Sequence, residues 1–86
     1  MSKSGARILV VDDELEIMRA LQRSLTAHGF EVFTASNGED ALEAVSHHRP
    51  DLMLLDLGLP GMSGLEVCKR IRECSFRPPS IRLLPE

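Results

Sequence analysis

The stretch PDLMLLDLGLPGMSG, Pro50 to Gly64, decides which fold this chain can adopt. Within it, Asp51 to Asp56 carries an unbroken apolar run, Leu52 to Leu55, which is typical of a strand covered on both faces of a parallel sheet. A loop rich in glycine follows from Leu57 to Gly64, and its Ser63 can cap the next helix. The stretch therefore predicts a strand, a loop and a helix start within an α/β fold.

The same alternation of strands and helices extends upstream. ILVVDDE, Ile8 to Glu14, is a second apolar run that ends in carboxylates. After it, apolar residues recur every three or four positions from Leu15 to Leu25, which indicates a helix with one buried stripe. Alternation with short loops predicts a parallel sheet with helices on both faces and right-handed crossovers. The expected elements are a strand at Arg7–Val11, a helix at Glu14–His28, a strand at Glu31–Ala35, a helix from Asn37 to about His48, a strand at Asp51–Asp56 and a helix from Ser63 to about Cys74.

The tail SFRPPSIRLLPE, Ser75 to Glu86, breaks this pattern. Pro78 and Pro79 cannot lie in a helix interior, and Ile81 to Leu84 can form at most a short edge strand. A chain of 86 residues is long enough for one domain. We therefore expect a disordered N-terminus at residues 1–6, one domain at residues 7–74, and an atypical tail at residues 75–86 that contains a short strand at most.

Charge and composition argue against several classes of partner. The formal net charge is −3, and the densest basic cluster, Lys69, Arg70 and Arg72, fits a solvated helix face better than a nucleic-acid patch. No apolar run approaches the roughly 20 residues that a membrane span needs, and the N-terminus lacks the apolar centre of a signal peptide. We expect a cytoplasmic protein without nucleic-acid or membrane partners.

Carboxylates follow two of the expected strands. Asp12 and Asp13 come directly after the strand at Arg7–Val11, and Asp56 ends the later one. Ligand groups in a doubly wound sheet gather beyond the carboxyl ends of strands, so these carboxylates would meet if the two strands are neighbours. Like charges about 4 Å apart repel by around 4 kcal/mol at an effective dielectric near 20, and a hard cation such as Mg²⁺ would relieve this. Singly, each residue has a simpler interpretation as a helix start or a turn cap.

Three segments occur in a specific order. ILVVDDE comes first, NGEDAL follows at Asn37 to Leu42, and PDLMLLDLGLPGMSGLEVCKRIR runs from Pro50 to Arg72. Together they resemble the receiver domain of bacterial two-component response regulators. The resemblance covers about Arg7 to Glu73, and its most specific part is the pattern D-x-x-[LM]-P-x-M-x-G at Asp56 to Gly64. It implies a flavodoxin-like, doubly wound parallel sheet that is incomplete after the third helix.

The resemblance implies a role for each carboxylate and for one carbonyl. Asp56 matches the phosphoacceptor, whose carboxylate attacks a phosphoryl group on a histidine of a sensor histidine kinase. Asp13 matches a direct Mg²⁺ ligand, and Asp12 matches the acidic neighbour that holds the ion partly through water. With Asp56 also a ligand, the Gly58 backbone carbonyl would complete the coordination. The expected protein is thus a signalling domain, not an enzyme, since any phosphotransfer is onto itself.

The tail departs from the family pattern. A family receiver has a fourth strand that ends in Ser or Thr and a fifth that ends in Lys; here Leu84 falls at the hydroxyl position, and the Lys has no counterpart. The third strand would have an unpaired edge and the first helix would lose cover, which predicts a homodimer that completes the fold. The leading hypothesis is a phosphoaccepting module without the switch apparatus. The alternatives are a dimerisation or kinase-competing module that needs no phosphorylation, and a remnant with little function.

Overall fold

The computed structural model describes residues 5–59, 61–74 and 78–84. In these ranges, strands and helices alternate along the chain. The elements are β1 (Arg7–Val11), α1 (Leu15–Ala27), β2 (Glu31–Ala35), α2 (Gly38–His48), β3 (Leu52–Asp56), α3 (Gly64–Cys74) and β4 (Ser80–Leu84). Every strand and helix expected from the sequence is formed, with bounds that shift by at most one residue.

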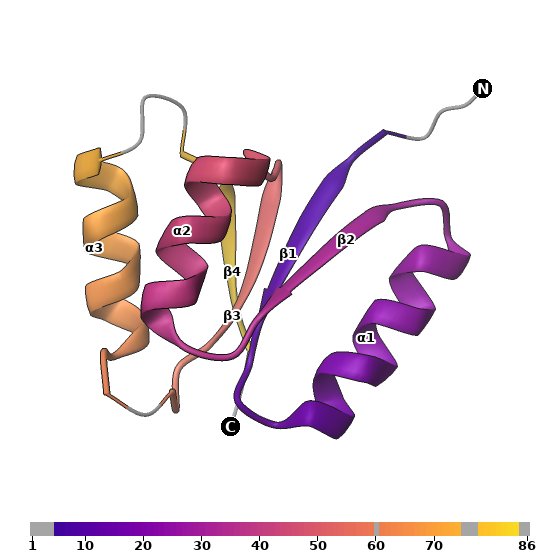
Figure 1. Cartoon of the computed structure of the whole chain (residues 1–86), viewed down its shortest axis with the longest axis horizontal. Coiled ribbons are helices and arrows are strands. Elements are labelled where there is room, and N and C mark those ends of the chain that lie inside the picture. Colours follow the sequence, from indigo (N-terminus) through magenta and orange to yellow (C-terminus); the bar gives the residue numbers. More distant parts are fainter. Residues whose placement is uncertain (1–4, 60, 75–77, 85–86) are drawn as a thin grey trace.

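The described strands form one parallel sheet in the order β2-β1-β3-β4. Helix α1 covers one face, and α2 and α3 lie side by side on the other (Figure 1). The chain passes outward from β1 to β2 and then crosses back to β3, so the strand order reverses between β1 and β3. This arrangement confirms the predicted flavodoxin-like α/β fold, and the reversal is where ligand groups gather in such sheets.

Alternate strand residues build a core on each face of the sheet. Both faces of β1 are buried, which explains its unbroken apolar sequence. On the α1 face, the half-buried Leu52 and Leu54 show that the cover thins out over β3, because α1 packs on β1 and β2. The core on the α2 and α3 face consists of Leu9, Val11, Ala35, Ala41, Val45, Met53, Leu55, Leu59, Val67 and Ile71, and the smaller core under α1 of Ile8, Val10 and Met18.

The tail contributes an edge strand. β4 pairs in parallel with all of β3, from Leu52 opposite Ser80 to Asp56 opposite Leu84. The expected short strand is therefore formed, and the prediction of an unpaired edge on the third strand was wrong, because the open edge belongs to β4. The arginine in the middle of this sequence, Arg82, argues against an interior strand but is compatible with an edge strand.

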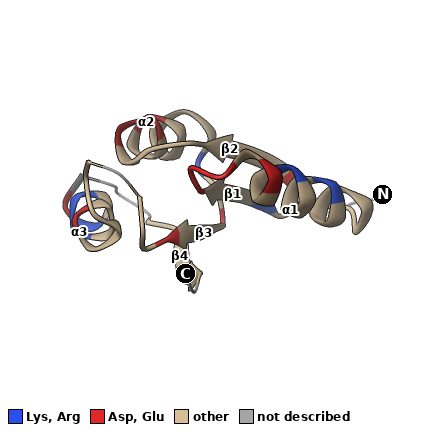
Figure 2. Cartoon of the chain, turned by 90° about the horizontal axis from the view of Figure 1, so that it is seen from below, with Lys and Arg blue, Asp and Glu red and all other residues tan. Residues whose placement is uncertain are grey.

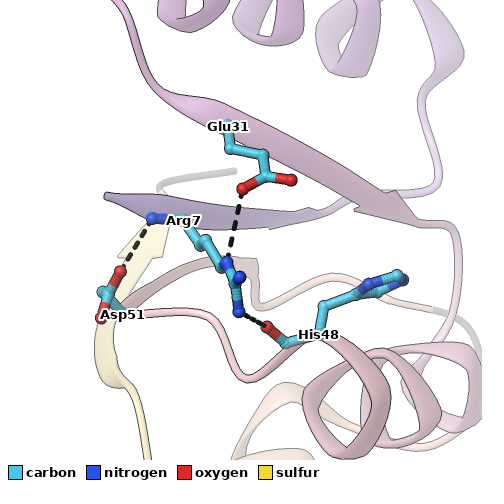
Figure 3. Close-up of polar contacts among 4 residues, drawn as sticks. All are labelled: Arg7, Glu31, His48 and Asp51. Carbon is cyan, nitrogen blue, oxygen red and sulfur yellow. Dashed lines mark hydrogen bonds and ion pairs between the residues drawn. The ribbon is translucent and has the colours of Figure 1, made fainter. Parts of the chain in front are cut away.

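Arg7 connects three elements at the amino ends of the strands (Figure 3). Its backbone N–H donates to Asp51 Oδ2 at 2.8 Å, its Nε donates to Glu31 Oε1 at 3.3 Å, and its Nη1 donates to the His48 carbonyl at 3.1 Å. The last contact satisfies one of the carbonyls that a helix C-terminus leaves without an intrahelical partner. Because the pair with Glu31 is about half exposed, it contributes at most about 1 kcal/mol, and Arg7 acts mainly by fixing positions.

Some sequence predictions concern residues at the ends of the described ranges. Of residues 1–6, residues 5 and 6 are described, and the Ala6 carbonyl accepts a hydrogen bond from the Glu31 N–H at 3.0 Å. Residues 1–4, like residues 75–77 and 85–86 of the tail, lie outside the described residues, so the predicted N-terminal disorder stays a prediction. Within the described ranges, no helix has the length and apolar character needed to cross a membrane.

Gly38 begins α2 at a position that has no room for a side chain. A Cβ there would lie 2.8 Å from Val67 Cγ2 and 3.0 Å from Met62 Cβ, both too close for ordinary packing. We expect Gly38→Ala to lower the free energy of unfolding by about 1–3 kcal/mol, because overpacking outweighs the roughly 1 kcal/mol by which alanine is favoured over glycine in a helix. Urea denaturation followed by circular dichroism measures the change.

The matched control is Glu39→Ala at the exposed neighbouring position, which should change the free energy of unfolding by less than about 0.5 kcal/mol. A Gly38→Ala variant as stable as the wild type, or more stable, would contradict the close packing of α2 on α3 and the loop before it.

Candidate functional site

The carboxyl ends of β1 and β3 carry acidic residues, at the edge of the sheet where the parallel strands end. Figure 2 shows acidic segments there in red. The two strands pair in parallel with Val11 opposite Leu55, so Asp12 and Asp56 occupy neighbouring strand ends. Asp12, Asp13 and Asp56 each offer one carboxylate oxygen, and these oxygens all lie within 4.8 Å of one another. The structure thus brings together the carboxylates that the sequence predicted to meet.

Asp12 is the buried member of this cluster, with 3% of its surface exposed. Its backbone N–H donates to the Ala35 carbonyl at 3.1 Å, and its Oδ1 accepts a hydrogen bond from the Glu14 N–H at 2.9 Å. Burial raises the pKa of the Asp12 carboxyl above its ordinary value of 3.8; the hydrogen bond from Glu14 opposes this, and the charges of Asp56 and Asp13 add to it. The ionised cluster is therefore under electrostatic strain that a cation would relieve.

Asp56 is held by the loop that follows it. Its Oδ1 accepts a hydrogen bond from the Gly58 N–H at 3.0 Å, which closes a tight turn directly after β3. Asp56 is partly buried and Asp13 is exposed, so the cluster is open to solvent on one side. Asp56 thus has the turn-capping role expected of it as a single residue, whereas Asp12 accepts a local hydrogen bond from Glu14 but does not cap α1, whose N-cap is Glu14. The role of the Gly58 carbonyl as a ligand stays a prediction.

The start of α3 packs against the chain just after Asp56. A Cβ on Gly64 would lie 3.1 Å from Leu57 Cδ2 and 3.4 Å from the Asp56 carbonyl oxygen, so the absence of a side chain permits this close approach. Ser63 Oγ accepts a hydrogen bond from the Glu66 N–H at 3.1 Å and caps the helix, as the sequence predicts. Together these contacts fix the position of the loop relative to the acidic cluster.

The donor atoms of the cluster suit a small, hard divalent cation. All three are carboxylate oxygens, the ligand type that Mg²⁺ prefers, and one exposed side leaves room for the water molecules that this ion retains. The described residues that face this edge thus fit Mg²⁺ by charge and by ligand chemistry.

On the far side of Asp56, β4 places an apolar residue. The register sets Leu84 opposite Asp56. Leucine cannot donate a hydrogen bond to an anion bound at the carboxylate. Leu84 therefore supplies no polar contact to such an anion.

Comparisons with known proteins agree with this geometry. The family model of the response regulator receiver domain matches residues 8–84. The transcriptional regulatory protein KdpE of Mycobacterium tuberculosis is 52% identical over 65 residues, which are 76% of this chain and 29% of KdpE. The N-terminal domain of a response regulator receiver protein from Methanoculleus marisnigri superposes with a TM-score of 0.87 at 36% identity, over 92% of this chain and 65% of that one.

A third similar protein is the response regulator TrrA of Thermotoga maritima. This chain superposes on the structure of the complex between TrrA and the histidine kinase ThkA with a TM-score of 0.81 at 45% identity. The match covers 91% of this chain and 66% of the chain in that structure. The structure of TrrA with Mg²⁺ and BeF gives a TM-score of 0.78 at 42% identity, with 91% and 65% covered.

This chain belongs to the response regulator receiver domain family. It spans just under two thirds of the solved receiver chains named above and 29% of KdpE. The family assignment therefore applies to the receiver fold and its acidic edge.

Removing one charge from the cluster should stabilise the metal-free protein. We expect Asp12→Asn to raise the free energy of unfolding at pH 7, in the presence of EDTA, by on the order of 1–3 kcal/mol, because it removes a buried charge beside two like charges. The folded-state pKa of Asp12 is raised, so the protonated carboxyl contributes to the free energy of unfolding in acid. This contribution is lost as the pH rises through that pKa. The gap between variant and wild type should therefore close as the pH falls toward 3.8. Urea denaturation at a series of pH values measures it.

Glu39→Gln serves as the control for charge removal, since Glu39 is exposed in the first turn of α2 and its charge is not among those that raise the pKa of Asp12. It should lower stability slightly, by less than about 1 kcal/mol, because an acid there interacts favourably with the helix dipole. An Asp12→Asn protein no more stable than the wild type at pH 7 would contradict the repulsion within the cluster.

Proposed function

We propose that this chain is a phosphoaccepting receiver module of a two-component phosphorelay. In this proposal, Asp12, Asp13 and Asp56 bind Mg²⁺ together with the Gly58 backbone carbonyl, and Asp56 accepts a phosphoryl group from a sensor histidine kinase. The observation that carries it is the convergence of three carboxylates at the reversal point of the sheet. Family membership and the TrrA complexes support the same assignment.

The geometry suits Asp56 as the nucleophile. Gly58 holds Oδ1 in the turn, so the carboxylate is oriented before any donor arrives, and it is more accessible than the buried Asp12. Its attack on a phosphohistidine would form a P–O bond and break the P–N bond, leaving an acyl phosphate on Asp56, while the released ring nitrogen of the histidine takes up a proton from water. When bound, Mg²⁺ would neutralise phosphoryl oxygens and lower the repulsion between the anionic donor and the carboxylates.

The proposed domain limits follow from the sheet. The expectation from sequence is a receiver-like domain at residues 7–74 followed by a separate tail. We propose to extend the domain to Leu84, because β4 pairs with β3 along its full length.

Phosphorylation can be tested without the kinase. Incubation with a small phosphodonor such as acetyl phosphate and Mg²⁺ should give a product heavier by one phosphoryl group, which intact-protein mass spectrometry detects. Asp56→Asn should abolish the product, because an amide is not a nucleophile toward phosphorus. EDTA should abolish or strongly reduce it, because the donor and the cluster are both anionic.

Glu43→Gln removes an exposed carboxylate from α2 and should leave the yield unchanged. Absence of any adduct on the wild type, or an adduct that persists in Asp56→Asn, would refute the phosphoacceptor assignment.

A second candidate function, dimerisation, is favoured by the open edge of the sheet. We propose that β4 forms a homodimer contact, because its backbone edge has no partner among the described strands. Leu83 on this strand is 48% exposed, and it lies on the α2 and α3 face, opposite Leu55 and two residues after Ile81. A second copy would shield both the backbone groups and this apolar surface.

Size-exclusion chromatography with light scattering at micromolar concentration tests the dimer. The wild type should have twice the mass of the chain, and Leu83→Glu should shift it to the monomer by placing a charge at the contact. Leu65→Glu alters a leucine that is 69% exposed on α3 and should leave the dimer intact. A wild type that remains monomeric over the whole concentration range would exclude this second function and leave the phosphoacceptor proposal standing.

A further inference from the structure

One arginine, Arg82, lies two residue pairs before Asp56 in the pairing of β4 with β3. Arg82 stands at the centre of β4, opposite Leu54, and Asp56 is two residues further along β3. Leu54 packs under α1 with Ile8 and Val10, and side chains alternate along a strand, so Asp56 belongs to the same face as Leu54. Arg82 therefore shares a face of the sheet with Asp56.

The other face gives an independent check on this orientation. Ile81 and its partner Met53 belong to the core under α2 and α3. Their neighbours in sequence, Arg82 and Leu54, must then lie on the α1 face.

The separation suits an arginine side chain. Adjacent strands lie about 4.8 Å apart and two strand residues span roughly 6.6 Å, so the Cα atoms of Arg82 and Asp56 are on the order of 8 Å apart. Long side chains reach diagonal neighbours at this distance on a sheet. The guanidinium can therefore approach an anion bound at the Asp56 carboxylate.

The Arg82 side chain is available for such a contact. It is exposed, and the structure gives it no hydrogen bond or ion pair among the described residues. Arg7 and Arg70, by comparison, are held by ion pairs with Glu31 and Glu66. Helix α1 covers β1 and β2, so it does not screen the α1 face of β4.

The chemistry of a phosphorylated site calls for one more cation. A phosphoryl group on Asp56 carries about two negative charges beside the carboxylates of Asp12 and Asp13, and together these exceed the charge of one divalent ion. Leu84, directly opposite Asp56, cannot donate a hydrogen bond, whereas a guanidinium presents a planar fork of donors that matches phosphoryl oxygens.

We propose that Arg82 is an anion-binding residue of this site and contacts the oxygens of a phosphoryl group on Asp56. This inference rests on the proposed phosphoacceptor function. It gives the β4 strand a role in the site, in addition to its role as the edge of the sheet.

Beryllofluoride with Mg²⁺, as a stand-in for the phosphoryl group, provides the test. Calorimetric titration with Mg²⁺ alone, and then fluorine NMR titration with beryllofluoride at saturating Mg²⁺, would be carried out on the wild type and on Arg82→Ala, Arg82→Lys and Arg72→Ala. Arg72 is an exposed arginine in the last turn of α3 and controls for loss of charge. Asp56→Asn identifies the site of binding.

Arg82→Ala should weaken beryllofluoride binding about tenfold, because it removes a charge-assisted contact. Its Mg²⁺ affinity should stay equal or increase slightly, since a nearby positive charge is lost. Arg82→Lys should recover part of the loss, and Arg72→Ala should match the wild type.

Equal beryllofluoride affinity in Arg82→Ala and Arg72→Ala would overturn the inference and leave the proposed function intact. A parallel loss of Mg²⁺ and beryllofluoride affinity in Arg82→Ala would also overturn it, because that pattern indicates structural damage. A wild type that binds no Mg²⁺ would refute the inference together with the proposed function.

Discussion

The parallel pairing of β1 with β3 is the constraint on which the rest of this structure depends. It puts the strand reversal at the centre of the sheet and sets Asp12 and Asp56 on adjacent strand ends. Without it, each carboxylate would cap a local turn and nothing more. With it, Asp12, Asp13 and Asp56 crowd within 4.8 Å, and electrostatic repulsion makes the edge selective for cations.

The two faces of the sheet serve different purposes. The face under α2 and α3 carries most of the buried apolar residues and fixes the loop after Asp56 through Gly64 and Ser63. The α1 face is covered over β1 and β2 and thins out toward β4. Most of the buried apolar surface that stabilises the fold therefore lies on the α2 and α3 face. The groups that can contact a ligand lie on the α1 face, beyond the strands that α1 covers.

Much of the fold and part of the site were predictable from sequence because the signals are local. The unbroken apolar run of β3 and the caps Asn37 and Ser63 fixed element bounds to within one residue, and both caps accept the expected backbone hydrogen bonds. The tail was harder, since Pro79 and Arg82 weaken the strand pattern and pairing with β3 stabilises an edge strand that propensity alone disfavours. The buried state of Asp12 and its raised pKa also depend on packing that no local pattern encodes.

The sequence by itself determined the order of elements, the family to which the chain belongs, and the identity of the carboxylates, because these follow from short apolar runs and from residues adjacent to them. Only the tertiary structure decided which strands are neighbours, that the open edge falls on β4, and that Arg82 shares a face with Asp56. The physical reason is that strand pairing and register are set by contacts between distant segments, and a register determines which side chains share a face.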